Sequence, residues 1–272
     1  MAALDVAPFL VLAVLYAVRA RTLRRRGAGV PRRRQASFAL SLVLLVAASL
    51  MPYEDELFFV HMIQHVVIGD LAALAFVLGL NWPLLRPLLA LEPVSRVRVL
   101  GHPLVALPLW TVNLYVWHLP RLYEGALHHG ALHALEHIFF FATGALMWAA
   151  VIEVLPGPEW FGTAAKFGYV IAVRLIETVL GNIFIWSGTV VYPVYERGDA
   201  RWGFSPLQDQ GLAGTIMMIE GSLVTIAAIA WLFLRLAAEG ELRQQLLEEG
   251  LDPRVVRRAV RYGRGKELES AG

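Results

Sequence analysis

The sequence contains no cysteine, and only 17% of its residues are charged. Without cysteine the chain can form no disulfide, no thiolate metal site and no cysteine nucleophile. Any metal ion would have to be held by imidazole, thioether or carboxylate groups. The low charge, together with 57% hydrophobic residues over 272 positions, excludes an ordinary soluble domain. No basic and aromatic surface of the kind that binds nucleic acid stands out, so we expect no nucleic-acid partner.

Several hydrophobic runs are long enough to cross a lipid bilayer. We therefore predict an all-α, polytopic membrane protein with seven transmembrane helices. The first run has no basic segment before it, so it is predicted to be a span and not a cleaved signal peptide. The transmembrane domain is predicted over residues 1–237, followed by a charged cytoplasmic C-terminal tail over 238–272. The predicted helices cover residues 4–20, 37–51, 57–80, 102–119, 132–155, 167–192 and 211–237.

Basic residues are distributed unevenly between the predicted loops. The segment from Arg19 to Arg34 alone holds eight arginines and no acidic residue. The other loops on that side bring the basic total to twelve, against three on the opposite side. Because cytoplasmic loops carry the excess of Lys and Arg, this predicts an outside N-terminus and a cytoplasmic C-terminus.

Histidines gather at the outer side of this predicted topology. His61 and His65 are four residues apart near the start of one predicted helix, so their side chains share a helix face. His133 and His137 repeat this spacing on another helix, and His118 ends a third. A single histidine at a helix end is usually an interfacial or capping residue. Five converging on one leaflet predict a metal site, because polar groups inside a membrane are costly and tend to be functional.

Other side chains are predicted to lie at the depth of these histidines or deeper in the membrane. Some of those at the depth of the histidines are candidates for further metal ligands or for groups that orient the imidazoles. Asp70, Arg174 and Glu177 are predicted to lie deeper, as a buried ion pair or triad, with an ion path as the alternative. Tyr115, Trp117 and Tyr123 are predicted to belong to an interfacial aromatic belt. The candidate additional ligands are Met62, Glu136, Asp209, Met217, Met218 and Glu220.

Four stretches of the sequence resemble the CtaG family of bacterial cytochrome c oxidase assembly factors. They are HMIQHVV at 61–67, YVWHLPRLYEGAL at 115–127, LHALEHIFFFATGALMW at 132–148 and DQGLAGTIMM at 209–218. The resemblance implies a seven-helix protein of the bacterial plasma membrane that helps copper reach a haem–copper oxidase. It also implies an oxidase subunit and a periplasmic copper donor as partners. The positions that match the family are His61, His65, His118, His133, His137, Glu136, Trp117 and Pro120.

The cluster is also compatible with other functions. A membrane di-iron oxygenase uses similar His-x-x-x-His pairs, but on the cytoplasmic side. His133-Ala-Leu-Glu136-His137 spells the inverted zinc-peptidase motif, in which the glutamate would be the general base. Two histidines at matched depth could ligate a haem. The predicted metal is copper(I) or copper(II), and zinc, iron and haem are the alternatives. The predicted class of protein is a copper chaperone without enzymatic activity.

Overall fold

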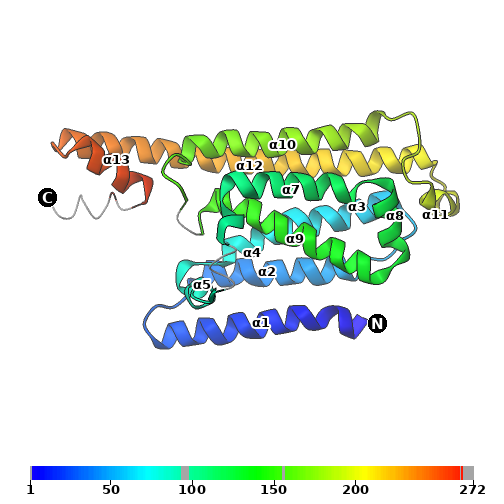
Figure 1. Cartoon of the computed structure of the whole chain (residues 1–272), viewed down its shortest axis with the longest axis horizontal. Helices are drawn as coiled ribbons and strands as arrows, with labels where there is room; N and C mark the ends of the chain where they lie inside the picture. The colour runs from blue at the N-terminus through cyan, green and yellow to red at the C-terminus, as the bar shows by residue number, and fades with distance from the viewer. Residues whose placement is uncertain (1, 93–97, 155–156, 264, 266–272) are drawn as a thin grey trace. The chain divides into compact units, whose positions relative to one another are not determined.

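The computed structural model describes residues 2–92, 98–154, 157–263 and 265, and within these ranges it contains helices and no strand (Figure 1). The predicted all-α class is therefore confirmed. The main helices are α1 (Ala2–Arg25), α2 (Arg32–Ser49), α3 (Phe58–Val66), η1 (Val67–Ala72), α4 (Ala73–Gly79), α5 (Trp82–Leu89), α7 (Pro103–Trp117), α8 (Pro120–His128), α9 (Gly130–Ile152), α10 (Thr163–Trp186), α11 (Glu196–Trp202), α12 (Pro206–Glu248) and α13 (Pro253–Arg261). Two short 3-10 turns are η2 (Arg98–Gly101) and η3 (Pro193–Tyr195).

Among the described residues, seven helical segments overlap the seven ranges that the sequence predicts. Within the described residues, four of them are long and apolar enough to cross a membrane, namely Phe58–Gly79, Gly130–Ile152, Thr163–Trp186 and Pro206–Glu248. Pro103–Trp117 is a shorter apolar helix. The arrangement with seven spans, and its orientation, remains a prediction. Residues 120–128 were expected to be a loop and instead form α8, which begins with a proline at its first turn, a favourable position for proline.

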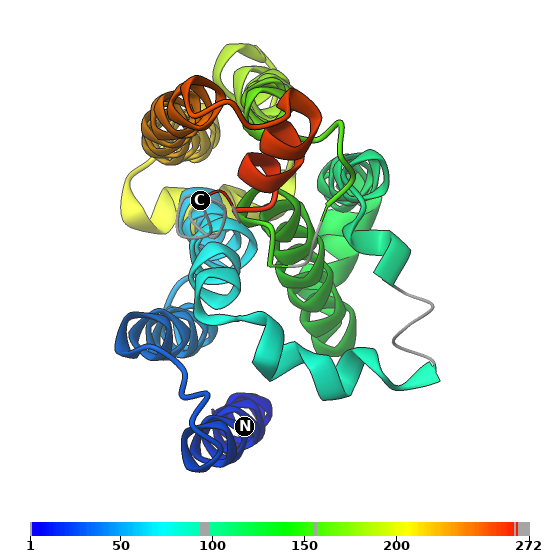
Figure 2. The same cartoon turned by 90° about the vertical axis from the view of Figure 1, so that its left-hand side faces the viewer.

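The chain divides into two compact units, and each is described by itself. The first comprises residues 1–155 and 176–220, and the second residues 156–175 and 221–272. In the first unit α2 packs against α4 and against η1, and α9 packs against α7, η1 and α4 (Figure 2). A stacked pair of rings, Tyr16 and Phe38, joins α1 to α2 with centroids 3.7 Å apart.

The segment from Phe58 to Gly79 is a continuous helix whose middle turns, η1, are a π-helix. It lies against α9 at two glycines, since a Cβ added to Gly144 would lie only 1.8 Å from the carbonyl oxygen of Gly69. Small residues permit such close backbone contact between helices in membranes. π-Helical turns are frequent at functional sites, and this one follows directly after His65 and carries Asp70.

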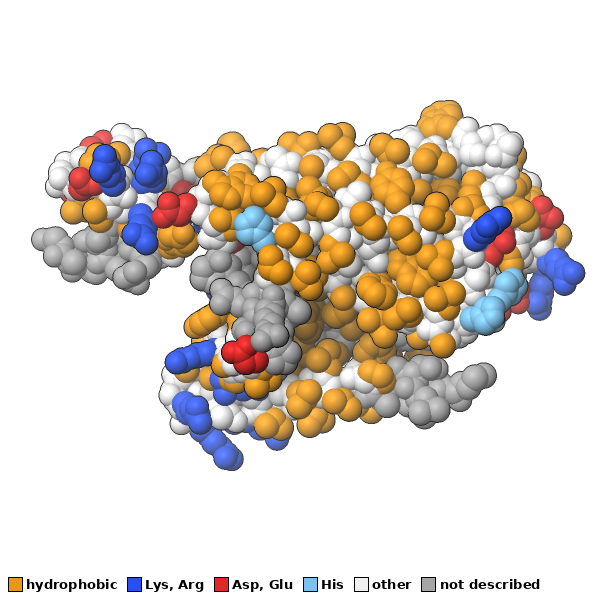
Figure 3. Space-filling model, viewed as in Figure 1, with side chains coloured by type: hydrophobic (Ala, Val, Ile, Leu, Met, Phe, Trp, Pro, Cys, Tyr) orange, Lys and Arg blue, Asp and Glu red, His pale blue; other side chains and the backbone are white. Residues whose placement is uncertain are grey.

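The two ends of the first unit differ in their side chains. At one end, Arg19 and Arg34 donate hydrogen bonds to backbone carbonyls of Pro83 and Leu80, just beyond α4. At the other end lie the start of α3, the end of α7 and the short helices α8 and α11 (Figure 1). His61 and Leu80 are separated by about 28 Å along the helix. On the visible face, hydrophobic side chains cover the length of the helices (Figure 3).

In the second unit a polar contact joins α10 to α12, and Arg261 of α13 donates hydrogen bonds to backbone carbonyls of the segment before α10. The hydroxyl of Thr163 donates to the carboxylate of Glu239 at 2.8 Å, and the guanidinium of Arg235 contacts the same carboxylate at 2.7 Å. Asp252 caps α13. The helix α12 continues through residue 237 to Glu248, so the predicted C-terminal tail begins inside a helix.

Candidate metal centre

The first His pair lies at the start of α3, where the carboxylate of Asp209 fixes the helix end. Asp209 accepts hydrogen bonds from the backbone amides of Phe58 at 2.7 Å and Phe59 at 2.8 Å. One turn later, His61 and His65 are 0% and 3% exposed, and their Nε2 atoms are 2.7 Å apart. At this distance one ring donates a hydrogen bond and the other accepts it, so both imidazoles can be neutral.

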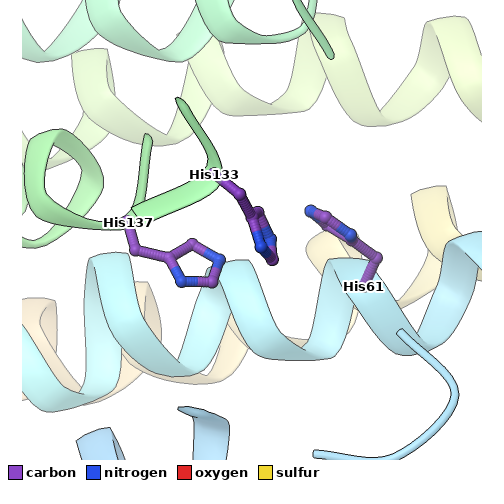
Figure 4. A group of neighbouring side chains, drawn as sticks. All are labelled: His61, His133 and His137. Carbon is purple, nitrogen blue, oxygen red and sulfur yellow. The ribbon is translucent and has the colours of Figure 1, made fainter. Parts of the chain in front are cut away.

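The second His pair lies on α9, and its rings lie beside that of His61 (Figure 4). The ring centroids of His133 and His137 are 4.2 Å apart, and those of His61 and His133 are 5.2 Å apart. Glu136, between the two α9 histidines, is 0% exposed, and its Oε1 lies 3.6 Å from Nε2 of His65. Two pairs predicted from separate parts of the sequence thus occupy one cluster.

His118, the residue at which α7 ends, lies at the edge of this cluster. Its ring centroid is 5.9 Å from that of His65. Its Nδ1 is 2.7 Å from the carbonyl oxygen of Leu114, so Nδ1 carries the proton and donates it, which leaves the lone pair on Nε2. Such a hydrogen bond to one ring nitrogen is how proteins orient the other nitrogen toward a metal.

The ligand atoms form two overlapping groups. In each group one ligand atom from every residue lies within 4.8 Å of the others. The first group consists of His61, His133 and His137, and the second of His61, His65 and Glu136. His118 belongs to neither.

Several of the possible ligand atoms are buried and make no hydrogen bond, which suits the binding of a cation. Within the described part of the chain, Nε2 of His118, His133 and His137 and both carboxylate oxygens of Glu136 are buried and have no hydrogen-bond partner. Buried polar atoms are normally paired, because leaving one unpaired costs free energy. A metal ion can satisfy several such lone pairs at once, and imidazole with carboxylate suits copper, zinc or iron.

An aromatic layer covers the cluster on the side of α8. Tyr123 is 1% exposed and its ring centroid is 5.1 Å from that of His61. Its hydroxyl is 2.9 Å from that of Tyr195, and Tyr192 donates to the backbone oxygen of His118 at 2.6 Å. Burial raises the pKa of Tyr123 and Tyr195 well above the ordinary value, so both phenols are neutral and are poor metal ligands.

The prediction of an interfacial belt is wrong for Tyr123 and for Trp117, which is 6% exposed. Both rings belong to the hydrophobic core around Phe58. Tyr115 is half-buried and donates to the backbone oxygen of Ile176 at 2.9 Å. The close packing of α8 against α9 explains the burial of Tyr123, and that packing could not be anticipated from a predicted loop.

The remaining candidate ligands have other surroundings. Met62 and Met217 are buried in the hydrophobic core, and Met218 packs against Gly181, where an added Cβ would lie 3.1 Å from its sulfur. Asp209 and Glu220 belong to neither ligand group among the described residues. Glu220 interacts with Asp70, which also accepts a hydrogen bond from the indole of Trp148.

Glu54 is a residue near the cluster that the sequence did not single out. One of its carboxylate oxygens is buried, and no hydrogen-bond partner for it lies among the described residues. Burial, with a smaller contribution from Asp55, raises the pKa of Glu54 to about 7. The charges of Glu54 and Glu136 act on each other. In the sequence, the position of Glu54 seven residues before His61, in the loop that leads into α3, was the signal that could have identified it. His128 and His129, by contrast, are exposed on the surface.

Comparison with known proteins gives three related sequences in mycobacteria. The chain is 28% identical over 239 residues to an uncharacterized protein of Mycobacterium bovis and to one of Mycobacterium tuberculosis, covering 80% of this chain and 36% of each relative. An uncharacterized protein of Mycobacterium leprae is 23% identical over 252 residues, covering 85% of this chain and 38% of the relative. The chain thus spans little more than a third of the length of these relatives. No solved structure matches.

A family match covers most of the chain. Residues 14–239, which include all seven long helical segments in whole or in part and every histidine of the cluster, match the family described as cytochrome c oxidase caa3 assembly factor. This agrees with the resemblance carried by the histidine-containing stretches, and the chain belongs to the caa3-type cytochrome c oxidase assembly factor family.

Proposed function

We propose that this protein is a membrane-embedded copper chaperone that helps to load a haem–copper cytochrome c oxidase through the histidine cluster. The observation that carries the proposal is the convergence of four imidazoles from two helices, with His118 at the edge, beside a buried carboxylate that has no hydrogen-bond partner among the described residues. Membership of an oxidase assembly family supports a role in the assembly of the oxidase, and the cluster offers ligands for the metal. The metal is cargo in this proposal, received from a periplasmic donor and passed to an oxidase subunit.

Copper is the favoured cargo because the donors are imidazoles. Among divalent first-row metals copper binds nitrogen ligands most strongly. The absence of cysteine removes the thiolates that would hold copper(I) too tightly to release readily. The methionines add less than the sequence suggested, since Met62 and Met217 lie in the hydrophobic core.

The proposal includes a location in the bacterial plasma membrane with the cluster toward the outside. The Arg19–Arg34 segment and the cluster lie at opposite ends of the first unit. If the arginines lie on the cytoplasmic side, as the positive-inside rule requires, the histidines are near the outer surface. A periplasmic donor and the oxidase could then reach them.

An enzymatic alternative is less well supported. In a zinc peptidase Glu136 would activate water beside a zinc ion held by His133 and His137. Glu136 is 0% exposed and groups instead with His61 and His65. A general base in that position would have no access to a peptide.

The test is the metal content of the purified protein in detergent, before and after incubation with copper. We expect about one copper ion per chain in the wild type and a loss of binding in His61→Ala/His137→Ala, because His61 belongs to both groups of ligand atoms and His137 is a second ligand of the first group. His128→Ala/His129→Ala is the matched control, since it also removes two imidazoles but from the exposed surface.

A wild-type protein that binds no copper, or a His61→Ala/His137→Ala variant that binds as tightly as the wild type, would refute the site. Delivery is tested separately in a strain that lacks the gene. The oxidase polypeptides should be made there but contain little copper, whereas an oxidase with normal copper content would exclude the delivery role.

A further inference from the structure

The two groups of ligand atoms differ in burial and in charge. The group of His61, His133 and His137 has two half-buried members and only neutral imidazoles. The group of His61, His65 and Glu136 is fully buried and includes a carboxylate. Only His61 is common to both.

The Nε2 atoms of His61 and His65 are also too close together to bind the same metal ion in their present arrangement. Two nitrogens bound to one tetrahedral ion at about 2.0–2.1 Å lie about 3.3 Å apart. The Nε2 atoms of His61 and His65 are 2.7 Å apart. An ion that binds Nε2 of His61 therefore has to break the hydrogen bond between these rings, whereas Nδ1 of His61 is buried and has no hydrogen-bond partner among the described residues. Once it is broken, His65 lies beside an ion bound through His61.

We propose that the cluster holds one metal ion at two alternative positions that share His61, an outer position formed with His133 and His137 and an inner position formed with His65 and Glu136. This inference rests on the proposed function and adds an internal step to it. The ion moves inward when its bonds to His133 and His137 break and bonds to His65 and Glu136 form. His61 remains bound throughout, so the ion never becomes free inside the protein.

Protons and electrons balance in this exchange. The ion keeps its oxidation state, because only its ligands change. If the ion binds through Nε2 of both rings, the ring that donates in the His61–His65 hydrogen bond takes its other tautomer, with the proton moved to Nδ1; if the ion binds that ring through Nδ1, no proton moves. No external reactant is required.

The surroundings assign different roles to the two positions. The outer position has three protein donors and half-buried histidines, so a fourth coordination site remains for a donor or acceptor protein, as in open metal sites. The inner position is buried, and Nε2 of His118, which has no hydrogen-bond partner among the described residues, lies at its edge. Its carboxylate also offsets part of the buried positive charge. The outer position is suited to exchange with partners and the inner position to storage.

Two variants separate the positions. Glu136→Gln keeps the shape of the side chain but removes the anionic ligand of the inner position. His133→Ala/His137→Ala removes the outer position and leaves the inner one. Each purified variant is loaded with one equivalent of Cu²⁺, its ligand set is determined by electron paramagnetic resonance, and the release of copper to EDTA is timed. Glu124→Gln, a carboxylate change on α8 outside both groups, is the matched control.

We expect both variants to bind one ion with different spectra. Glu136→Gln should show nitrogen ligands only and should release copper at least 10-fold faster than His133→Ala/His137→Ala, which should show two nitrogens and a carboxylate oxygen. The wild type should release its copper in two kinetic phases, and Glu124→Gln should behave like the wild type. The wild-type measurement requires no substitution, and His133→Asn/His137→Asn repeats the test if the alanine variant does not fold.

Identical spectra and release rates in the two variants, loss of all binding in either folded variant, or a single release phase in the wild type would overturn the two positions while leaving a single copper site intact. A wild-type protein that binds no copper would instead refute the proposed function, and this inference with it.

Discussion

The contact between Gly144 and Gly69 gives a quantitative test of how the cluster is assembled. In Gly144→Ala the new Cβ would lie 1.8 Å from the carbonyl oxygen of Gly69. A carbon and a carbonyl oxygen in contact need about 3.3 Å, so α9 and η1 would have to separate by about 1.5 Å. Neither atom belongs to a flexible side chain, and the helices themselves must move.

This displacement reaches the ligands. Gly144 is two helical turns, or about 10 Å, beyond His137 on the same helix. Metal–ligand distances tolerate deviations of only about 0.2 Å, and a functional site about 0.5 Å. A separation three times the larger value should take His133, Glu136 and His137 out of range of α3. We therefore expect Gly144→Ala to lose stoichiometric copper binding although no ligand is changed.

The same substitution should destabilise the bundle. Overpacking costs about 1–3 kcal/mol, and a backbone contact places this change near the top of that range. At about 2–4 °C for each kcal/mol, the melting temperature should fall by about 10 °C. Circular dichroism during heating and metal analysis measure the two effects. Gly211→Ala is the matched control, because a Cβ at Gly211, also in a long helix, has no atom within 4 Å among the described residues.

Gly144→Ala with full copper binding and an unchanged melting temperature would refute the reasoning that this contact sets the spacing of α3 and α9. Loss of stability without loss of binding would show instead that the cluster adjusts to the displacement. Both outcomes are distinguishable from a failure of the copper proposal, because the wild-type protein is measured in the same series.

Two further predictions concern orientation and pH. Because the chain has no cysteine, single cysteines at Asp55 and Gly203 should react with an impermeant thiol reagent in intact cells and one at Gly29 should not; the reverse pattern would contradict an outward-facing cluster. Burial, followed by the neighbouring Asp209, raises the pKa of Asp199 from 3.8 to about 7. Its contribution to stability is therefore complete below about pH 4 and is lost as the pH rises through about 7. The melting temperature should fall between about pH 4 and 7 in the wild type and fall less in Asp199→Asn, and equal slopes would refute this assignment.

Much of the fold can be predicted from local patterns in the sequence. Long apolar runs predict the long helices, because every backbone group in a membrane must be paired within its own segment. The i, i+4 spacing of His61 with His65 and of His133 with His137 predicts two shared faces. The charge asymmetry of the loops then assigns both pairs to one side before any contact is known.

Other features depend on contacts between distant residues. The carboxylate of Asp209 was a candidate ligand, yet it accepts hydrogen bonds from amides about 150 positions earlier in the chain. Tyr123 could be placed in the core only once α8 was known to pack on α9. The proline that begins α8 was a helix-start signal, and it could have corrected the predicted loop. The π-helical turns after His65 have no comparable signal in the sequence.

The unpaired state of Glu136 connects the stability of the protein to its proposed task. A buried carboxyl group whose oxygens have no hydrogen-bond partner is costly, so Glu136 reduces the stability of the bundle. In the proposed function a bound ion would relieve that cost, and part of the affinity for metal would then come from the protein and not from the strength of the metal–ligand bonds. A site of this kind can bind selectively without the tight thiolate bonds that would oppose release. In the proposed delivery role, the ion would leave when a partner offers ligands whose binding energy exceeds this cost, and a delivery protein requires such a balance.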